Sequence, residues 1–278
     1  MTHRRWGQIA FARLLALGLL GMGFAVQAAD VTFTGSTTLL PIAQAVAEAL
    51  ADQYDIEVAG GGSSVGVAAL IDGTTDIGDH SRPIKSSEYE KAVAVGVFPF
   101  TFHVANDALA VIVHKDNPIA DLTLEQLKGI YQVKVANWDQ LGWDGGGPIV
   151  VVGRDSASGT FETWEKLVMD SERPDPAVLA LASNADVAAE VANNPNAIGY
   201  VGIAYVNGEL HNQLTVGGKE ATLATAIDYT YPISRPLFMS TNGFPGPGAV
   251  LDVILFVLSD AGQQLVEEVG YAPIRELD

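Results

Sequence analysis

The sequence contains no cysteine among its 278 residues, and this absence excludes several kinds of site. Without cysteine there is no disulfide framework, no thiolate ligand for zinc and no thiol for lipid attachment. The histidines show no His-Glu-x-x-His spacing. Asp72, Asp76 and Asp79 lack the Asp-x-Asp spacing of a calcium loop, and we interpret them as turn and capping acids. We therefore expect no metal ion and no cofactor.

Basic residues are also scarce. There are 15 Lys and Arg against 33 Asp and Glu, which gives a formal net charge of -18. Such a chain repels nucleic acid and anionic membrane at long range, so we expect no nucleic-acid partner. Any anion that binds must be held by a local arrangement that overcomes this overall field.

Long apolar runs are absent except near the beginning of the sequence. Residues 14–26 form an apolar run that follows three arginines and is followed by two alanines. This pattern predicts a secretory signal peptide over residues 1–29, cleaved after Ala28. No later run approaches the length of a membrane-spanning helix. We expect a soluble protein exported to the bacterial periplasm.

The chain is long enough for two modest α/β domains, and 48% of its residues are hydrophobic. One local pattern occurs three times: a β-prone strand, a loop, small hydroxyl residues and an apolar helical face. The strand residues are 31–34, 56–59 and 149–152, and the junction residues that follow them are Ser36, Thr37 and Thr38, then Ser63 and Ser64, then Ser158, Gly159 and Thr160.

These junctions have the chemistry of an oxyanion site. A helix start leaves backbone N–H groups free and carries a partial positive charge, while glycine permits close approach and Ser or Thr adds a hydroxyl donor. Arg154, in the third junction, would add charge-assisted hydrogen bonds. Ordinary helix capping explains any single junction. Three junctions and an arginine favour a site for phosphate or sulfate, because strand ends in a doubly wound sheet face one crevice.

A hydrolase is the main enzymatic alternative, since "AGGGSSVG" contains a G-x-S-x-G centred on Ser64. That mechanism needs a histidine late in the chain, and we interpret His211, the only one placed there, as a surface loop residue. The same stretch lacks the Lys-Ser/Thr of a phosphate-binding P-loop. We therefore expect a binding protein with no catalytic residues.

Other patterns predict structural elements. The apolar runs at residues 109–115 and 197–206 are candidates for crossovers between domains. Capping boxes predict helix starts at Thr123 and at Ser87. The C-terminal region predicts two helices, the second capped by Ser259.

Beyond these local patterns, the chain resembles the periplasmic phosphate-binding proteins of high-affinity bacterial phosphate ABC transporters. The resemblance covers almost all of the sequence after residue 29, in the order found in the family. It is carried by "GSTTLLPIAQAVAEAL", "GGGSSVGVAALIDGTTDIGDHSRPI", "DALAVIVHKDNPI", "LTLEQLKGIY", "NWDQLG", "GRDSASGTFETW", "AIGYVGIAYV", "YPISRPLFM" and "VLSDAGQQLVEEVGYAPI".

The resemblance implies a type II periplasmic binding protein, with two α/β domains joined by two crossover strands and closing on one ligand. It implies residues 30–105 plus 228–278 as domain I and residues 106–227 as domain II. It also implies a monomer that delivers inorganic phosphate to a membrane permease. Carried over to this sequence, the phosphate ligands would be Thr37, Thr38, the backbone of Leu39, Ser63, Ser81, Arg154, Ser158, Gly159 and Thr160.

One position departs from the family. Several members have an aspartate where this chain has Ser81, and that carboxylate accepts the proton of hydrogen phosphate. A serine both donates and accepts, so phosphate remains compatible while strict rejection of sulfate is in question. Asp79 or His80 is a candidate substitute for the missing carboxylate. The alternatives are a site for sulfate, molybdate or tungstate, or a periplasmic phosphatase on the same scaffold.

Overall fold

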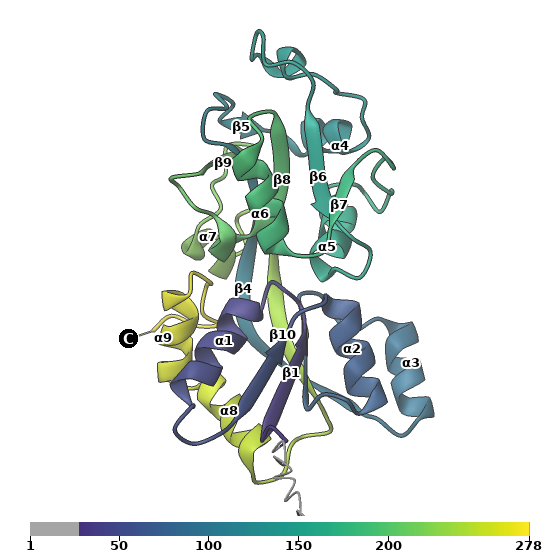
Figure 1. Cartoon of the computed structure of the whole chain (residues 1–278), viewed down its shortest axis with the longest axis vertical. Coiled ribbons are helices and arrows are strands. Elements are labelled where there is room, and N and C mark those ends of the chain that lie inside the picture. The colour runs from purple at the N-terminus through teal and green to yellow at the C-terminus, as the bar shows by residue number, and fades with distance from the viewer. Residues whose placement is uncertain (1–27, 278) are drawn as a thin grey trace, which may run out of the picture.

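The computed structural model describes residues 28–277, so the predicted signal peptide lies almost wholly outside the described residues. The described chain forms two lobes, stacked along the long axis of the molecule, with two strands running between them (Figure 1). The helices are α1 (Leu40–Ala49), α2 (Ser63–Asp72), α3 (Ser86–Ala94), α4 (Leu124–Tyr131), α5 (Gly159–Leu167), α6 (Asn184–Asn193), α7 (Leu223–Ile227), α8 (Ala249–Leu258) and α9 (Asp260–Glu268), with short 3-10 helices η1 (Trp138–Leu141) and η2 (Ile203–Tyr205). The strands are β1 (Val31–Gly35), β2 (Ile56–Ala59), β3 (Ile77–His80), β4 (Pro99–His114), β5 (Asp121–Leu122), β6 (Val150–Arg154), β7 (Leu179–Leu181), β8 (Ala197–Gly202), β9 (His211–Val216) and β10 (Ser234–Asn242).

The strands follow one continuous order, β2-β1-β3-β10-β4-β8-β6-β7, and β9 pairs with β4 and β5 off this path. In the lower lobe β1 is parallel to β2 and β3, and in the upper lobe β6 is parallel to β7 and β8. Parallel strands end at the same edge, so each lobe directs its strand-to-helix junctions towards the other lobe.

Each lobe buries its own apolar core. The lower core packs β1 and β3 against α1, α8 and α9, with Phe33, Ile42 and Val253 fully buried. The upper core packs β4, β6 and β8 against α4, α5 and α6 around Trp164 and Tyr200, whose rings stack 4.1 Å apart. Because each lobe has its own hydrophobic core, the two lobes have the organisation of domains that move relative to each other as rigid bodies.

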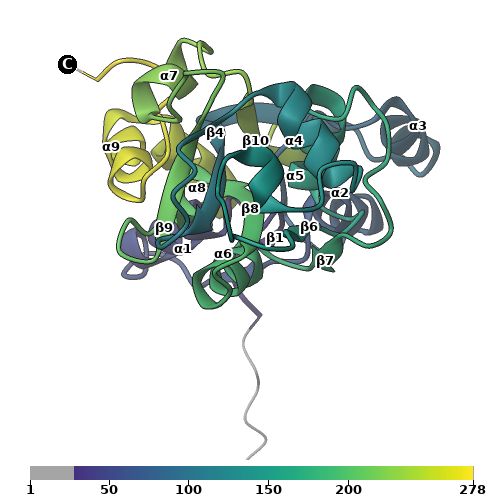
Figure 2. The same ribbon diagram turned by 90° about the horizontal axis from the view of Figure 1, so that it is seen from above.

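The strands β4 and β10 pass between the lobes and pair antiparallel along their length. Seen from above, they lie near the middle of the molecule, with α9 on one side and α2 and α3 on the other (Figure 2). The predicted crossover at residues 109–115 falls on the right strand with the wrong bounds: residues 109–114 belong to β4 but lie inside the upper lobe, and the part of β4 between the lobes precedes them. The predicted crossover at residues 197–206 is wrong, because that run forms β8 and η2 inside the upper lobe. Buried strands of both kinds are apolar, so composition does not distinguish them.

The helix starts are mostly as predicted. Thr123 caps α4, with Gln126 completing the box, and Ser259 caps α9 through the N–H of Gly262. The start predicted at Ser87 is wrong, because α3 begins at Ser86. There Glu88 accepts the N–H of Lys85, and its carboxylate is anchored by Arg82.

Within residues 28–277, no single helix is long and apolar enough to cross a membrane. The helices α8 and α9 pass a test of length and composition only when taken together, and they are bent by 69°.

Candidate oxyanion-binding site

The three predicted strand-to-helix junctions are confirmed, and they meet between the lobes. They are β1 to α1, β2 to α2 and β6 to α5. Thr38 Oγ1, from the first, lies 2.9 Å from Thr160 Oγ1, from the third. Ser63 Oγ, from the second, lies 3.3 Å from Ser81 Oγ, which follows β3. All four side chains are fully buried, so the lobes enclose a cluster of hydroxyl groups.

Glycines allow the two lobes to approach at this cluster. A Cβ atom on Gly159 would lie 2.3 Å from Ser63 Oγ and 2.8 Å from Ser81 Oγ. Gly62 has φ +104, and a Cβ there would lie 2.6 Å from the carbonyl oxygen of Ala157. Close approach of these glycines to an anion stays a prediction, whereas the structure shows that they permit close approach of the facing lobe.

Helix starts contribute backbone dipoles to the same place. The side chain of Ser158 caps α5 by accepting the N–H groups of Thr160 and Phe161. The helix α2 begins at Ser63 with no side-chain cap. The N–H of Leu39 donates to the carbonyl oxygen of Ser36 at 3.0 Å. The positive ends of α2 and α5 therefore face the hydroxyl cluster from opposite lobes.

Arg154 ends β6 and is 2% exposed. Its Nε and Nη2 donate to the carbonyl oxygens of Leu181 and Ala182 at 3.2 and 2.7 Å. Its buried Nη1 has no hydrogen-bond partner among residues 28–277. Burial lowers the pKa of Arg154 from its usual value. The neighbouring Asp155 accepts the N–H of Ala157 at 3.0 Å, which makes it a turn cap, and its charge partly offsets the effect of burial on the pKa of Arg154.

Arg235 is a second buried cation at the cluster, and the sequence reasoning did not assign it a role. It lies on β10, is 4% exposed and donates through Nη2 to Thr38 Oγ1 at 3.1 Å and to Thr160 Oγ1 at 3.0 Å. Its Nη1 lies 3.3 Å from the carbonyl oxygen of Ser81. Arg235 lies in the quoted stretch "YPISRPLFM", but nothing local in that stretch marks it as reaching two of the junctions and the residue that follows β3.

Asn184, the first residue of α6, was also missed. Its Nδ2 donates to Thr37 Oγ1 at 3.1 Å and to Thr38 Oγ1 at 3.2 Å, and its Oδ1 accepts the N–H of Gly202 at 3.2 Å. The hydroxyl of Tyr205 donates to the carbonyl oxygen of Thr37. These contacts place the β1 to α1 junction of the lower lobe against α6 and η2 of the upper lobe.

The structure thus brings together the side chains of Thr37, Thr38, Ser63, Ser81, Ser158 and Thr160, with Gly159 between them. Arg154 lies close enough to Arg235 for the second cation to contribute to the lowered pKa of the first, although burial is the larger cause. That these residues bind an anion stays a prediction.

Neither candidate for the missing carboxylate contacts the cluster. Asp79 is a strand residue, 2% exposed, so its interpretation as a turn or capping acid is wrong; burial raises its pKa well above the ordinary value. Its buried Oδ1 has no hydrogen-bond partner in the described part of the chain. The ring of His80 bonds to the carbonyl oxygen of Arg82 at 2.6 Å and to Ser240 Oγ at 2.7 Å.

The contacts of Ser64 do not match those of a hydrolase nucleophile. Its Oγ accepts a hydrogen bond from Arg82 Nη2 at 3.1 Å, and none of its hydrogen bonds within residues 28–277 involves a histidine. His211 lies on β9 and is 3% exposed, so its interpretation as a surface loop residue is wrong. Its Nε2 bonds to the carbonyl oxygen of Ala188 at 2.8 Å, away from Ser64.

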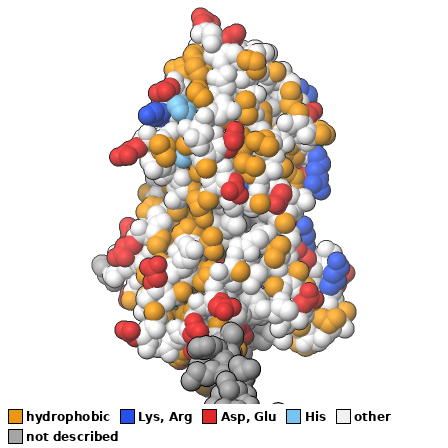
Figure 3. Space-filling model, in the orientation of Figure 1, with side chains coloured by type: hydrophobic (Ala, Val, Ile, Leu, Met, Phe, Trp, Pro, Cys, Tyr) orange, Lys and Arg blue, Asp and Glu red, His pale blue; other side chains and the backbone are white. Residues whose placement is uncertain are grey.

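A pocket of about 480 Å³ adjoins the cluster between the lobes. Ser81, Thr163 and Arg235 line its inner part, together with the charged side chains of Arg82, Lys85, Glu162 and Lys166. On the face shown in Figure 3, most Lys and Arg side chains lie along the edge on which α3, α4 and α5 lie, while Asp and Glu are scattered. The pocket therefore opens on the more basic edge of an acidic protein.

Ion pairs join the lobes beside this pocket. Glu162, on α5 of the upper lobe, lies 2.9 Å from Arg82 Nε and 2.9 Å from Lys85 Nζ, both of the lower lobe. Arg82 also pairs with Glu88 at 2.7 Å. The side chains of Arg82 and Glu162 are 6% and 16% exposed, so solvent screens this contact less than it screens a surface ion pair.

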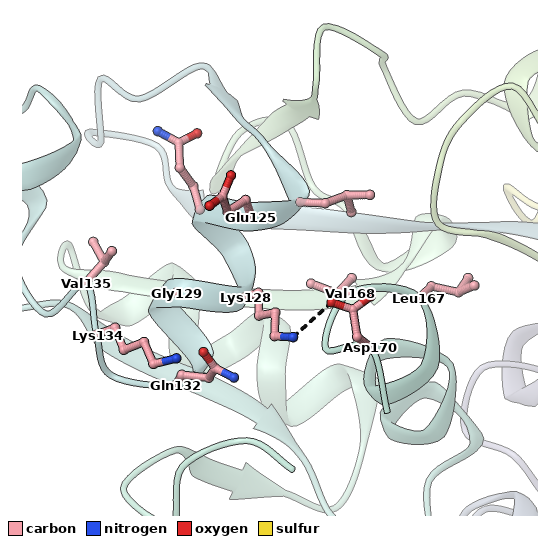
Figure 4. A pocket seen from close by; sticks show the side chains of 11 residues that line it. Glu125, Lys128, Gly129, Gln132, Lys134, Val135, Leu167, Val168 and Asp170 are labelled. Carbon is pink, nitrogen blue, oxygen red and sulfur yellow. Dashed lines mark hydrogen bonds and ion pairs between the residues drawn. The ribbon is translucent and has the colours of Figure 1, made fainter. Parts of the chain in front are cut away.

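A pocket of about 720 Å³ lies in the upper lobe beside α4, away from the cluster. Figure 4 shows Lys128 reaching Asp170, at 2.9 Å, and Lys128 also pairs with Glu172. Within residues 28–277, no buried polar side-chain atom that lines this pocket lacks a hydrogen-bond partner, in contrast to Arg154 Nη1. No group of three or more His, Cys, Asp or Glu side chains suited to a metal ion occurs within residues 28–277.

Comparison with known proteins gives consistent matches over most of the chain. Residues 24–261 match the sequence profile of the PBP superfamily domain. The phosphate-binding protein PstS of Pseudomonas aeruginosa is 32% identical over 268 residues, which cover 88% of this chain and 83% of that protein.

Solved structures agree with these matches. A substrate-binding protein from Clostridium perfringens, assigned to a phosphate ABC transporter and crystallised with bound phosphate, has a TM-score of 0.82 and 32% identity, covering 88% of this chain and 99% of that one. An ABC-type phosphate transport receptor from Vibrio cholerae has a TM-score of 0.67 and 30% identity, covering 87% and 99%.

Proposed function

This chain belongs to the PBP superfamily and, within it, to the family of phosphate-binding proteins. From this premise we propose that it captures inorganic phosphate between its lobes and delivers it to an ABC importer. The observation that carries the proposal is the buried hydroxyl cluster. Hydroxyl donors from both lobes and two helix starts converge there. Arg154, whose Nη1 has no partner among residues 28–277, lies near Arg235 of the cluster. Such a set of donors complements an anion rich in acceptor oxygens.

The binding residues are the nine expected from the resemblance. The hydroxyl groups of Thr37, Thr38, Ser63, Ser81, Ser158 and Thr160 and the backbone of Leu39 and Gly159 surround the anion, and Arg154 supplies the principal charge. The ion arrives through the pocket between the lobes, which then close about β4 and β10. In this account residues 30–105 plus 228–278 move as domain I against residues 106–227 as domain II.

The protein binds phosphate without catalysing a reaction. Ser64 is held by Arg82, and no hydrogen bond of Ser63 or Ser64 in the described part of the chain involves a histidine that would act as a base. The relatives reported above are named as binding proteins, a receptor and a transporter component. A chromogenic phosphate ester assay, with Ser63→Ala as the control, tests this part of the proposal. Turnover that the substitution abolishes would contradict it.

The partner is the membrane permease of the importer. The protein acts in the periplasm after cleavage of the signal peptide predicted over residues 1–29, and it works as a monomer. Its net charge of -18 disfavours nucleic acid as a partner.

A second oxyanion remains a candidate ligand because of Ser81. Its Oγ accepts a hydrogen bond from Ser36 Oγ at 3.0 Å and lies 3.3 Å from Ser63 Oγ, so a hydroxyl pair stands where a carboxylate would select a protonated anion. Sulfate, molybdate and tungstate are therefore the competitors to titrate against phosphate.

Native mass spectrometry of the protein purified without added ligand tests the proposal. We expect a bound mass equal to that of phosphate, which disappears when a phosphate-consuming enzyme is present during purification. A protein that carries no anion, and whose thermal unfolding does not shift when phosphate is added, would contradict it.

A further inference from the structure

The hydrogen-bond partners of Thr38 fix the direction in which its hydroxyl donates. A threonine hydroxyl has one hydrogen and two acceptor lone pairs. Thr38 Oγ1 accepts hydrogen bonds from Asn184 Nδ2 at 3.2 Å and from Arg235 Nη2 at 3.1 Å. The oxygen and nitrogen of the Asn184 amide cannot exchange places, because Oδ1 accepts the N–H of Gly202. Both lone pairs are therefore taken, so in the 2.9 Å contact with Thr160 it is Thr38 that donates.

The hydroxyl of Thr160 likewise accepts hydrogen bonds from protein donors and keeps its own hydrogen free to donate. Its Oγ1 accepts from Thr38 and from Arg235 Nη2, the latter at 3.0 Å, so its lone pairs are also taken. Arg235 Nη2 has two hydrogens, of which one bonds to Asp107 and the other is shared between the two threonines. The Thr160 hydrogen is then left to donate outwards.

The hydroxyls of Ser158 and Thr37 also accept hydrogen bonds from protein donors. Ser158 Oγ accepts the N–H groups of Thr160 and Phe161 at 3.1 and 3.2 Å. Thr37 Oγ1 accepts from the backbone N and Nδ2 of Asn184 at 3.4 and 3.1 Å. Protein N–H groups thus occupy the lone pairs of these two hydroxyls. Their hydrogens are therefore left to donate to an acceptor such as an oxyanion.

Arg235 is held rigidly for this task. Arg235 on β10 and Asp107 on β4 are directly opposite each other in the register of the two strands. Asp107 Oδ2 accepts from Arg235 Nε at 2.9 Å and from Nη2 at 2.7 Å, and Oδ1 accepts the N–H of Ile203 at 3.0 Å. The planar guanidinium is therefore fixed in orientation by a carboxylate that is itself fully buried.

We propose that Arg235 is a positioning residue of the anion site: held by Asp107 between the lobes, it directs the Thr38 hydroxyl to donate to Thr160 and the Thr160 hydroxyl to donate to the bound anion. Because Thr38 belongs to the lower lobe and Thr160 to the upper, Arg235 completes this donor set only when the lobes are closed. The inference rests on the proposed function, since it concerns how the same site holds phosphate.

The test is a set of phosphate titrations by calorimetry. Replacing the pair together, Asp107→Asn with Arg235→Gln, avoids leaving one buried charge unpaired. Thr160→Val removes the last hydroxyl of the series, and the triple variant completes a double-mutant cycle. Arg235→Lys keeps the charge but not the planar fork, and it gives a second cycle with Thr160→Val if the paired variant does not fold. Arg173→Gln, at an exposed arginine, is the matched control.

We expect the paired variant and Thr160→Val each to weaken phosphate binding at least tenfold. The phosphate affinity of the triple variant should lie within about twofold of the lower of those two affinities. Arg235→Lys should remain several-fold weaker than wild type with an unchanged unfolding midpoint, and Arg173→Gln should bind normally. Full affinity in the paired variant, losses that multiply in the triple variant, or full affinity in Arg235→Lys would overturn the inference while leaving phosphate binding intact. A wild-type protein that binds no phosphate would refute the proposed function and the inference together.

Discussion

Thr38 Oγ1 and Thr160 Oγ1 lie 2.9 Å apart, although Thr38 lies in a junction of the lower lobe and Thr160 in the first turn of α5 in the upper lobe. This contact exists only while the lobes are closed. The proposed binding residues and the conformational state of the protein are therefore linked, and an anion that bonds to donors of both lobes stabilises closure.

Arg154 supplies the principal charge in the proposed site. We expect Arg154→Ala to weaken phosphate binding at least tenfold, consistent with about 2 kcal/mol for a lost charged hydrogen bond. Calorimetry measures this directly, and Arg173→Ala is the control because Arg173 is an exposed arginine of the same lobe. Unchanged affinity in Arg154→Ala would remove Arg154 from the site.

Glu162 joins the lobes through Arg82 and Lys85 without belonging to the hydroxyl cluster. We expect Glu162→Gln to speed phosphate release roughly fivefold, about 1 kcal/mol, because the closed state loses its ion pairs. Stopped-flow measurement of the dissociation rate tests this.

Glu165→Gln is the matched control for Glu162, because Glu165 is on the same helix but pairs with Arg173 of its own lobe. Its release rate should equal that of wild type. Equal rates in all three proteins would show that the interlobe ion pairs do not hold the closed state.

We expect Ser81 to set how strongly the proposed site distinguishes hydrogen phosphate from sulfate. Ser81→Asp introduces an acceptor that matches the proton of hydrogen phosphate and repels fully ionised sulfate. We therefore expect the ratio of phosphate to sulfate affinity to rise in the variant, measured by competition titration. An unchanged or smaller ratio would mean that selectivity is set elsewhere in the site.

His80 makes stability depend on pH. Burial lowers its pKa from 6.5 to about 4, so the neutral ring favours the folded state. The stabilisation is complete above pH 6.5 and is lost as the pH falls towards 4, by about 3 kcal/mol in total. Urea unfolding across this range should show that loss in wild type and not in His80→Gln.

Neighbouring groups require the comparison between wild type and variant. The carbonyl oxygen of Arg82 and the carboxylate of Glu88 favour charging of His80, whereas the guanidinium of Arg82 opposes it. Burial raises the pKa of Asp79 and so gives a pH dependence of the opposite sign. The difference between the two curves cancels the contribution of Asp79. Parallel curves between pH 6.5 and 4 would contradict the role given to His80.

The sequence predicted the local elements of the site well. Hydroxyl residues between β-prone strands and apolar helices marked all three junctions, because capping chemistry and helix periodicity depend on near neighbours. Ser158 caps α5 as a local rule requires, and Ser63 begins α2.

Contacts between distant segments could not be predicted in the same way. Arg235 reaches Thr38 across 197 residues and Asn184 reaches it across 146, and each depends on how the two lobes meet. The crossover at residues 197–206 was misplaced for a similar reason, since a strand inside a lobe and a strand between lobes are equally apolar. The sequence does not reveal that Asp79 is buried, because a buried carboxylate whose Oδ1 has no hydrogen-bond partner among residues 28–277 is rare and has no local signal.

Calorimetric titration of phosphate into protein freed of bound anion tests the central claim most directly. The account predicts one phosphate ion bound per chain, with an affinity that falls at least tenfold in Arg154→Ala. Absence of binding heat at several temperatures, together with an unfolding midpoint that phosphate does not raise, would contradict the claim that this protein captures phosphate.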